Sequence, residues 1–200
     1  MTNKMIKKKV KNNLEVRQFD CHELRTIKDE KGKKKVKGYA AVFNSLSEDL
    51  GGFREKINRN AFDNVLDDDV VAVFNHDMNM VLGRTSSGTL KISVDERGLF
   101  TEIDMPNTTL GNDLTELVER GDISKMSFGF YVDRDAWIES ETDFVREVKE
   151  VKRLIDVSLV TKPAYNDTSV AVRSLDNYRQ HKTELNNLNK YKIKLLNLKK

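Results

Sequence analysis

The 200-residue chain has only three histidines, so few side chains can serve as a general base. His22 lies beside Cys21 in a polar stretch, and His181 lies in a basic C-terminal segment. His76 instead follows the apolar run at residues 70–75, which is typical of a buried strand. A histidine at the end of such a strand has an anchored backbone, and imidazole suits proton transfer near neutral pH. His76 is therefore the candidate general base, although a lone strand-end histidine is more often structural.

A candidate nucleophile lies in the segment at residues 123–130. In an extended strand the apolar side chains at positions 126, 128, 130 and 132 share one face, and Ser127 and Gly129 share the other. The glycine would leave room for a substrate backbone to approach the hydroxyl. The pattern is not the Gly-x-Ser-x-Gly elbow, so an α/β-hydrolase fold is not implied. Ser127 is the candidate nucleophile, and an edge-facing serine without a function is the simpler alternative.

Asp156 interrupts an apolar run that is predicted to be buried on both faces. A buried carboxylate is unfavourable unless it is paired or hydrogen-bonded. One way to satisfy it is to orient a histidine and stabilise its imidazolium. A salt bridge with Arg153 or Lys152 is the other. Asp156 is thus a candidate third member of a catalytic triad.

Strands dominate the predicted structure between residues 14 and 173. Residues 14–19 alternate between apolar and polar, and a lysine-rich turn at 28–35 joins them to a second strand at 36–43. Further strands are predicted at 70–75, 90–94, 99–105, 126–132 and 144–161. The strands at 90–94 and 99–105 would form a hairpin around the turn at residues 95–98. The pattern therefore predicts a mostly β domain.

Three helices are predicted among these strands and after them. A short one at 61–66 would be capped by Asn60, and a longer one at 109–120 would end at Gly121 in a left-handed conformation. Residues 175–198 form an amphipathic pattern rich in Asn and Lys, which indicates an appendage rather than part of the core.

The net charge of +3 is distributed unevenly. Residues 1–13 carry +5, residues 174–200 carry +5, and residues 14–173 carry −7. This division predicts a basic N-terminal tail, a domain at 14–173 and a basic C-terminal tail at 174–200. Basic ends can bind nucleic acid or an acidic protein surface, or can act as solubilising tails. The acidic middle has no basic, aromatic-rich strand, which argues against nucleic acid as the partner.

Other chemistry has little support in the sequence. The single cysteine, Cys21, excludes an intramolecular disulfide and a multi-cysteine zinc site. Cys21 and His22 would point to opposite faces of a strand, so they form no nucleophile–base pair. His76 with Asp77 supplies too few ligands for a metal, and we expect no cofactor. No run of about 18 apolar residues occurs, so no membrane partner is expected.

Seven short motifs, in order, resemble the prohead maturation proteases of tailed phages, which are related to the herpesvirus assemblins. The resemblance covers roughly residues 14–173 of the chain. The motifs are Gly-Tyr-Ala-Ala-Val-Phe-Asn at 38–44, Phe-Arg-Glu-Lys-Ile at 53–57 with Asn-Ala-Phe at 60–62, Asn-His-Asp at 75–77, Leu-Gly-Arg at 82–84, Gly-Leu at 98–99, Ser-Lys-Met-Ser-Phe-Gly-Phe at 124–130 and Asp-Val-Ser-Leu-Val-Thr-Lys-Pro-Ala-Tyr at 156–165.

The resemblance implies an α+β, mostly β fold: an antiparallel, β-barrel-like sheet flanked by helices, as in the assemblins, with a basic C-terminal helical extension. It places the family's histidine on His76 and its serine on Ser127. The third member falls on Asp156, where many relatives carry glutamate, and Glu150 and Asp77 are the alternatives. Arg84 is a conceivable contributor to the oxyanion hole, directly or through water.

The implied function is a serine endopeptidase that cleaves scaffold and capsid protein segments, and itself, inside the assembling prohead in the bacterial cytoplasm. The major capsid protein and its scaffold segment would be the substrates, and the protease is expected to self-associate. The helix at 175–198 would be a targeting or self-cleaved tail. The alternative is a non-enzymatic capsid scaffold protein on the same fold, for which Ser127→Ala would change nothing.

Overall fold

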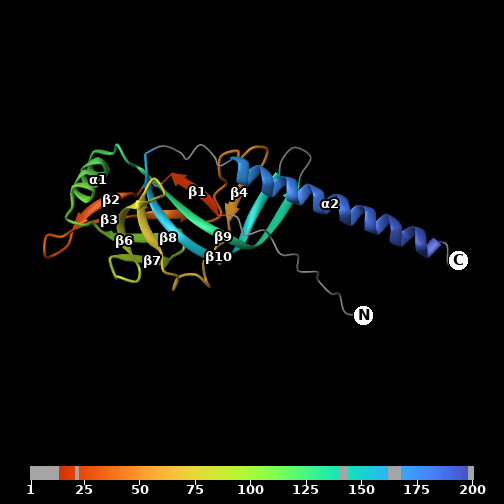
Figure 1. Ribbon diagram of the computed structural model, residues 1–200, viewed down its shortest axis with the longest axis horizontal. Coiled ribbons are helices and arrows are strands. Elements are labelled where there is room, and N and C mark those ends of the chain that lie inside the picture. Colours follow the sequence, from red (N-terminus) through yellow and green to blue (C-terminus); the bar gives the residue numbers. More distant parts are fainter. Residues whose placement is uncertain (1–13, 21–22, 140–143, 162–167, 198–200) are drawn as a thin grey trace.

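The strands of the chain form two sheets in the computed structural model, which describes residues 14–20, 23–139, 144–161 and 168–197 (Figure 1). The larger sheet contains β1 (Glu15–Asp20), β4 (Arg54–Ile57), β5 (Val71–Phe74), β6 (Asp77–Arg84), β9 (Lys125–Glu139) and β10 (Phe144–Val160). The smaller sheet contains β2 (Arg25–Lys28), β3 (Lys34–Val42), β7 (Leu90–Val94) and β8 (Gly98–Asp104). The predicted α+β, mostly β fold is confirmed.

The order of the larger sheet is β1-β9-β10-β5-β6, with β4 also paired to β10. Its centre is the long antiparallel pair β9–β10, whereas β4 and β5 both run parallel to β10. The sheet is therefore mixed rather than purely antiparallel, because long segments separate β4 and β5 from β10 and allow crossover connections. The described strands form two open sheets and do not close into a barrel.

The main hydrophobic core contains side chains from both sheets. The predicted apolar face of β9 is buried in it, with Phe128 stacked on Phe130 and in edge contact with Phe62. From the smaller sheet, Leu99 and Ile103 are also completely buried. This packing fixes which face of β9 points away from the core, and hence where Ser127 lies.

The described ranges contain two α-helices in addition to the strands. In α1 (Thr109–Arg120) the Thr108 side chain accepts a hydrogen bond from Gly111 N, and Gly121 ends the helix with φ 82°, as its position predicted. The second helix, α2 (Thr168–Asn197), begins seven residues before the predicted start and extends away from the sheets (Figure 1). Leu175 of α2 is buried against the loop that precedes β4, whereas later apolar side chains such as Leu188 are exposed.

Two sequence-based predictions were wrong in detail. The first strand, β1, was expected to form a hairpin with the strand at 36–43, but it pairs with β9. The hairpin partner of β3 is β2 instead, whose four residues are too few to show an alternating pattern. The predicted helix at 61–66 is a series of turns with bonds from Ala61 N to Asn58 O and from Val65 N to Phe62 O. Its buried apolar side chains satisfy the core without a continuous helix.

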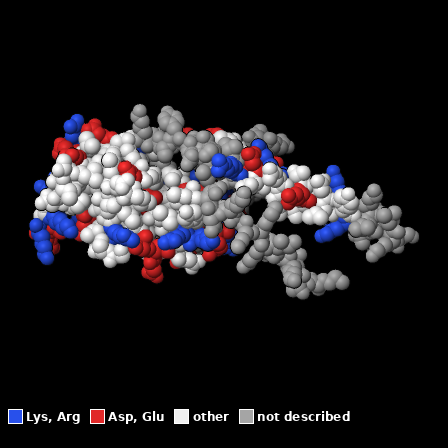
Figure 2. Space-filling view, in the orientation of Figure 1, with Lys and Arg blue, Asp and Glu red and all other residues white. Residues whose placement is uncertain are grey.

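Figure 2 shows where charged side chains lie on one face of the molecule. Much of this face over the sheets is uncharged, and basic and acidic groups lie close together along its left and lower edges and on α2. This face therefore offers no extended basic patch of the kind that binds nucleic acid. Neither α1 nor α2, as far as they are described, is long and apolar enough to cross a membrane.

A buried network of charges connects β1 to the rest of the larger sheet. The Arg17 guanidinium lies 2.6 Å from Glu55 and 2.5 Å from Glu15, and the Arg146 guanidinium lies 2.6 Å from Glu15 and 2.7 Å from Asp135. Burial alone would raise the pKa of Glu15, but the charges of Arg146 and Arg17 outweigh it and hold that pKa below its usual value. The network therefore anchors the N-terminal strand.

We expect Glu15→Gln to destabilise the fold by about 3 kcal/mol at pH 7, because it leaves buried guanidinium groups short of a partner. The lowered pKa means that the Glu15 carboxylate stabilises the fold fully above pH 4.5, and that this contribution is lost as the pH falls further. Urea unfolding from pH 7 to pH 3 should therefore show a flatter pH dependence for Glu15→Gln. Glu96→Gln is the control, since Glu96 is 93% exposed and its loss should change stability by less than about 0.5 kcal/mol.

Candidate active site

His76 lies in the two-residue turn between β5 and β6. Asn75 and His76 have φ angles of 49° and 59°, the pattern of a type I′ hairpin turn. Asparagine suits such a conformation better than histidine does, so other contacts must hold this turn. Asn75 N donates to Leu159 O at 3.0 Å, and the Asn75 Oδ1 accepts from Thr161 N at 3.2 Å. The tip of the hairpin is thus bound to the end of β10.

A β-bulge sets the direction of Asp156. Leu154 pairs with Phe130, but Asp156 pairs with Gly129, so Ile155 is an extra residue on β10. Without it, Leu154 and Asp156 would share the core face. The bulge instead places Asp156 on the face opposite the core, beside Gly129. This explains how a carboxylate can occur in an apolar run that is buried on both sides.

The register beyond the bulge brings the three predicted triad residues together. Ser127 and Asp156 lie on the same face of neighbouring strands, and the His76 ring lies between them. His76 Nε2 is 2.6 Å from Ser127 Oγ, and His76 Nδ1 is 2.6 Å from Asp156 Oδ1. A carboxylate, an imidazole and a hydroxyl in this order can transfer a proton from the hydroxyl to the ring.

The Ser127 hydroxyl has a second neighbour. Its oxygen lies 2.9 Å from the carbonyl oxygen of Arg17, to which it can donate a hydrogen bond. A hydroxyl has one proton, so the Arg17 carbonyl and His76 Nε2 compete for it. Ser127 is completely buried in this arrangement, and the His76 side chain is 18% exposed. The Arg17 carbonyl is therefore the alternative hydrogen-bond acceptor for the Ser127 hydroxyl when that hydroxyl does not donate to His76 Nε2. The sequence could not place this carbonyl beside Ser127.

Gly129 accommodates the carboxylate rather than a substrate. A Cβ built on Gly129 would overlap the Oδ2 of Asp156 and lie 3.2 Å from its Cγ. The space beside Gly129, which was expected to admit a substrate backbone, is thus filled by the Asp156 side chain. Cross-strand pairing causes this, and no pattern within residues 123–130 reveals it.

The other acidic candidates have partners elsewhere. Glu150 accepts from Asn64 at 2.8 Å, and Asp77 accepts from the backbone of Asn79 at 2.8 Å. Neither makes the contact with the His76 ring that Asp156 makes. The geometry therefore favours Asp156 as the orienting carboxylate.

Arg84 is not brought to these three residues. It pairs with Val71 at the open end of the β5–β6 hairpin, whereas His76 is at the turn. Its guanidinium lies 2.6 Å from Asp69, and this hydrogen bond lowers the pKa of the Asp69 carboxyl. The arrangement gives Arg84 a surface ion pair and no described contact with the triad.

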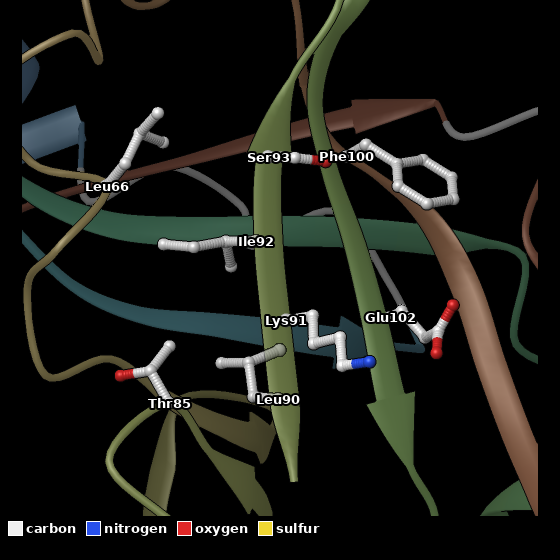
Figure 3. A pocket seen from close by; sticks show the side chains of 8 residues that line it. All are labelled: Leu66, Thr85, Leu90, Lys91, Ile92, Ser93, Phe100 and Glu102. Carbon is white, nitrogen blue, oxygen red and sulfur yellow. The ribbon is translucent and has the colours of Figure 1, made fainter. Parts of the chain in front are cut away.

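The structure bears on some of the other candidate sites. Cys21 and His22 lie outside the described residues. Within the described ranges, no group of three or more His, Cys, Asp or Glu side chains could hold a metal. A cavity of about 480 Å³ lies against β7 and β8 and is separate from the triad (Figure 3). It is lined by Leu66, Thr85, Leu90, Lys91, Ile92, Ser93, Phe100 and Glu102.

Comparison with known proteins identifies the family. Residues 22–182 match the caudovirus prohead serine proteases. The chain belongs to this family. It is a capsid maturation protease. The capsid assembly protease of bacteriophage T4 is a similar solved structure, with a TM-score of 0.47 and 9% identity over 74% of this chain and 98% of that one. No curated protein matches the sequence.

Substitution of Gly129 tests the packing beneath the carboxylate of this prohead protease. We expect Gly129→Ala to destabilise the fold by about 1–3 kcal/mol, because the new methyl group overlaps Asp156. The cost of the same substitution should fall below about 0.5 kcal/mol in an Asp156→Ala background. Urea unfolding of the four proteins measures this coupling. Equal costs in both backgrounds would show that Asp156 does not occupy the space at Gly129.

Proposed function

We propose that this prohead protease is a serine endopeptidase in which Ser127 is the nucleophile, His76 the general base and Asp156 the orienting carboxylate. The observation that carries the proposal is the His76 ring, which has hydrogen-bond contacts of 2.6 Å to Ser127 on one side and to Asp156 on the other. The family supports a serine nucleophile, since its description names serine proteases.

In the first half of the reaction, His76 Nε2 takes the Ser127 proton while Oγ bonds to the carbonyl carbon of the scissile peptide. Asp156 accepts a hydrogen bond from the Nδ1–H of His76 throughout and stabilises the imidazolium that forms, without taking the proton itself. The tetrahedral intermediate collapses when the carbon–nitrogen bond breaks, and the imidazolium gives its proton to the leaving amine. An acyl ester on Ser127 remains.

In the second half, His76 takes a proton from a water molecule, whose oxygen attacks the ester carbon. The second tetrahedral intermediate releases a carboxylic acid, and the imidazolium returns its proton to Ser127. In the resting enzyme the Arg17 carbonyl competes with His76 Nε2 for the hydrogen bond from the Ser127 hydroxyl. The reaction therefore starts from the orientation of the hydroxyl in which its hydrogen points to His76.

The substrates that we propose are the major capsid protein and its scaffold segment, inside the assembling prohead in the host cytoplasm. The protease would also cleave itself and self-associate. A polypeptide substrate agrees with the position of the triad at the tip of a hairpin, where the His76 side chain is partly exposed, and apart from the cavity against β7 and β8. The exposed part of α2 would be a targeting or self-cleaved tail.

Co-expression with the major capsid protein of the same phage tests the nucleophile. Intact mass should show trimmed capsid protein with the wild-type protease and none with Ser127→Ala, since removing a triad nucleophile lowers the rate by roughly 10⁴–10⁶-fold. His76→Ala and Asp156→Asn should also be inactive. Ser93→Ala, an exposed serine on β7, is the matched control and should cleave normally. Identical capsid masses with wild type and Ser127→Ala would refute the serine mechanism and favour a scaffold role.

A further inference from the structure

A second serine, Ser158, contacts two members of the triad. It lies two residues after Asp156 on β10, opposite Ser127, and is completely buried. Its oxygen is 2.9 Å from Asp156 Oδ1, 3.2 Å from the backbone nitrogen of His76 and 3.2 Å from His76 Nδ1. These hydrogen bonds reach both the carboxylate and the histidine, so they bear directly on the site.

The neighbours of Ser158 favour one direction for its single proton, toward the nearer acceptor, Asp156. An ionised carboxylate can only accept, so the Ser158 hydroxyl donates to Asp156. A backbone N–H can only donate, so one lone pair of Ser158 accepts from His76 N. The remaining lone pair faces His76 Nδ1, which therefore has two acceptors near it, Asp156 and Ser158. A proton on Nδ1 satisfies both, and a bare Nδ1 would satisfy neither.

We infer that Ser158 is a positioning residue that, together with Asp156, holds His76 in the Nδ1-protonated tautomer and also holds the turn that carries His76. This inference rests on the proposed serine mechanism. With the proton on Nδ1, the lone pair of Nε2 faces Ser127 and can take its proton. Ser158 itself is no nucleophile, because its proton is committed to Asp156 and it lies on the Nδ1 side of the ring.

The backbone contact adds a second positioning effect. His76 has a φ of 59°, a conformation that is unfavourable for a residue with a side chain. The hydrogen bond from His76 N to Ser158 Oγ helps to hold this turn, together with the two bonds made by Asn75. Loss of the hydroxyl therefore loosens both the ring and the backbone of the base.

The kinetic test compares Ser158→Ala and Ser158→Cys with wild type, using purified protease and the major capsid protein of the same phage. We expect kcat to fall about 10- to 100-fold with KM changed by less than about threefold, since the hydroxyl orients the base and does not bind substrate. Ser158→Cys fills the site but is a weak hydrogen-bond donor and acceptor, so it separates the hydrogen bonds from packing. Thr101→Val, which removes a buried hydroxyl from β8, is the control and should leave kcat unchanged.

The spectroscopic test reads the tautomer directly. Nitrogen-15 NMR of histidine-labelled protein, in the Ser127→Ala, His22→Gln, His181→Gln background, leaves His76 as the single imidazole. With Ser158 present, the neutral ring should carry its proton on Nδ1. With Ser158→Cys, where Asp156 alone accepts from Nδ1, a detectable share of the rings should carry the proton on Nε2 instead, and Thr101→Val should leave the signal unchanged.

The outcomes distinguish the two proposals. Cleavage by Ser127→Ala would overturn the proposed function. If Ser127→Ala is inactive but Ser158→Cys keeps wild-type kcat or an unchanged tautomer, the serine mechanism stands and the role of Ser158 is refuted. Should Ser158→Ala fail to fold, the volume-matched Ser158→Cys still decides the question.

Discussion

The register of β9 against β10 determines where every group of the site lies. A slip of one residue would turn each side chain of a strand to the other face of the sheet. The β9–β10 pair has several such irregularities, and the one at Ile155 lies beside the site, so that Leu154 faces the core while Asp156 and Ser158 lie on the same face as Ser127. The apolar side chains of β9 fix which face of that strand points to the core, because Phe128 and Phe130 are completely buried. Core packing therefore places the catalytic candidates.

The ends of the site are held by two different kinds of interaction. On one side, backbone and side-chain hydrogen bonds from β10 keep Asn75 and His76 in a turn that they would not readily adopt alone. On the other side, the buried network around Glu15 and Arg146 keeps β1 beside β9, with the Arg17 carbonyl next to the nucleophile. Buried charges add little net stability when compared with apolar residues, but they penalise any other placement of β1. Their contribution here is the position of the strand.

Short-range patterns predicted most of the elements and the three triad candidates, but not how strands pair. The cap at Gly121 and the hairpin at Asp95–Gly98 depend on local backbone chemistry, so the sequence revealed them. The partner of β1, the parallel strands beside β10 and the bulge at Ile155 depend on contacts between distant segments. For the same reason the roles of Gly129 and Ser158 were missed. Because side chains two positions apart in a strand share a face, the sequence could have indicated that Ser158 lies on the same face as Asp156.

The most direct test of the central claim is to identify the atom that reacts. A fluorophosphonate reagent forms an oxygen–phosphorus bond with an activated serine as the phosphorus–fluorine bond breaks and fluoride leaves. Peptide mapping by mass spectrometry should find the phosphonyl group on Ser127 of the wild-type protease, and none on His76→Ala treated in the same way. Modification of Ser158 instead, or capsid cleavage that continues after complete treatment with Ser127 unmodified, would contradict the proposed triad.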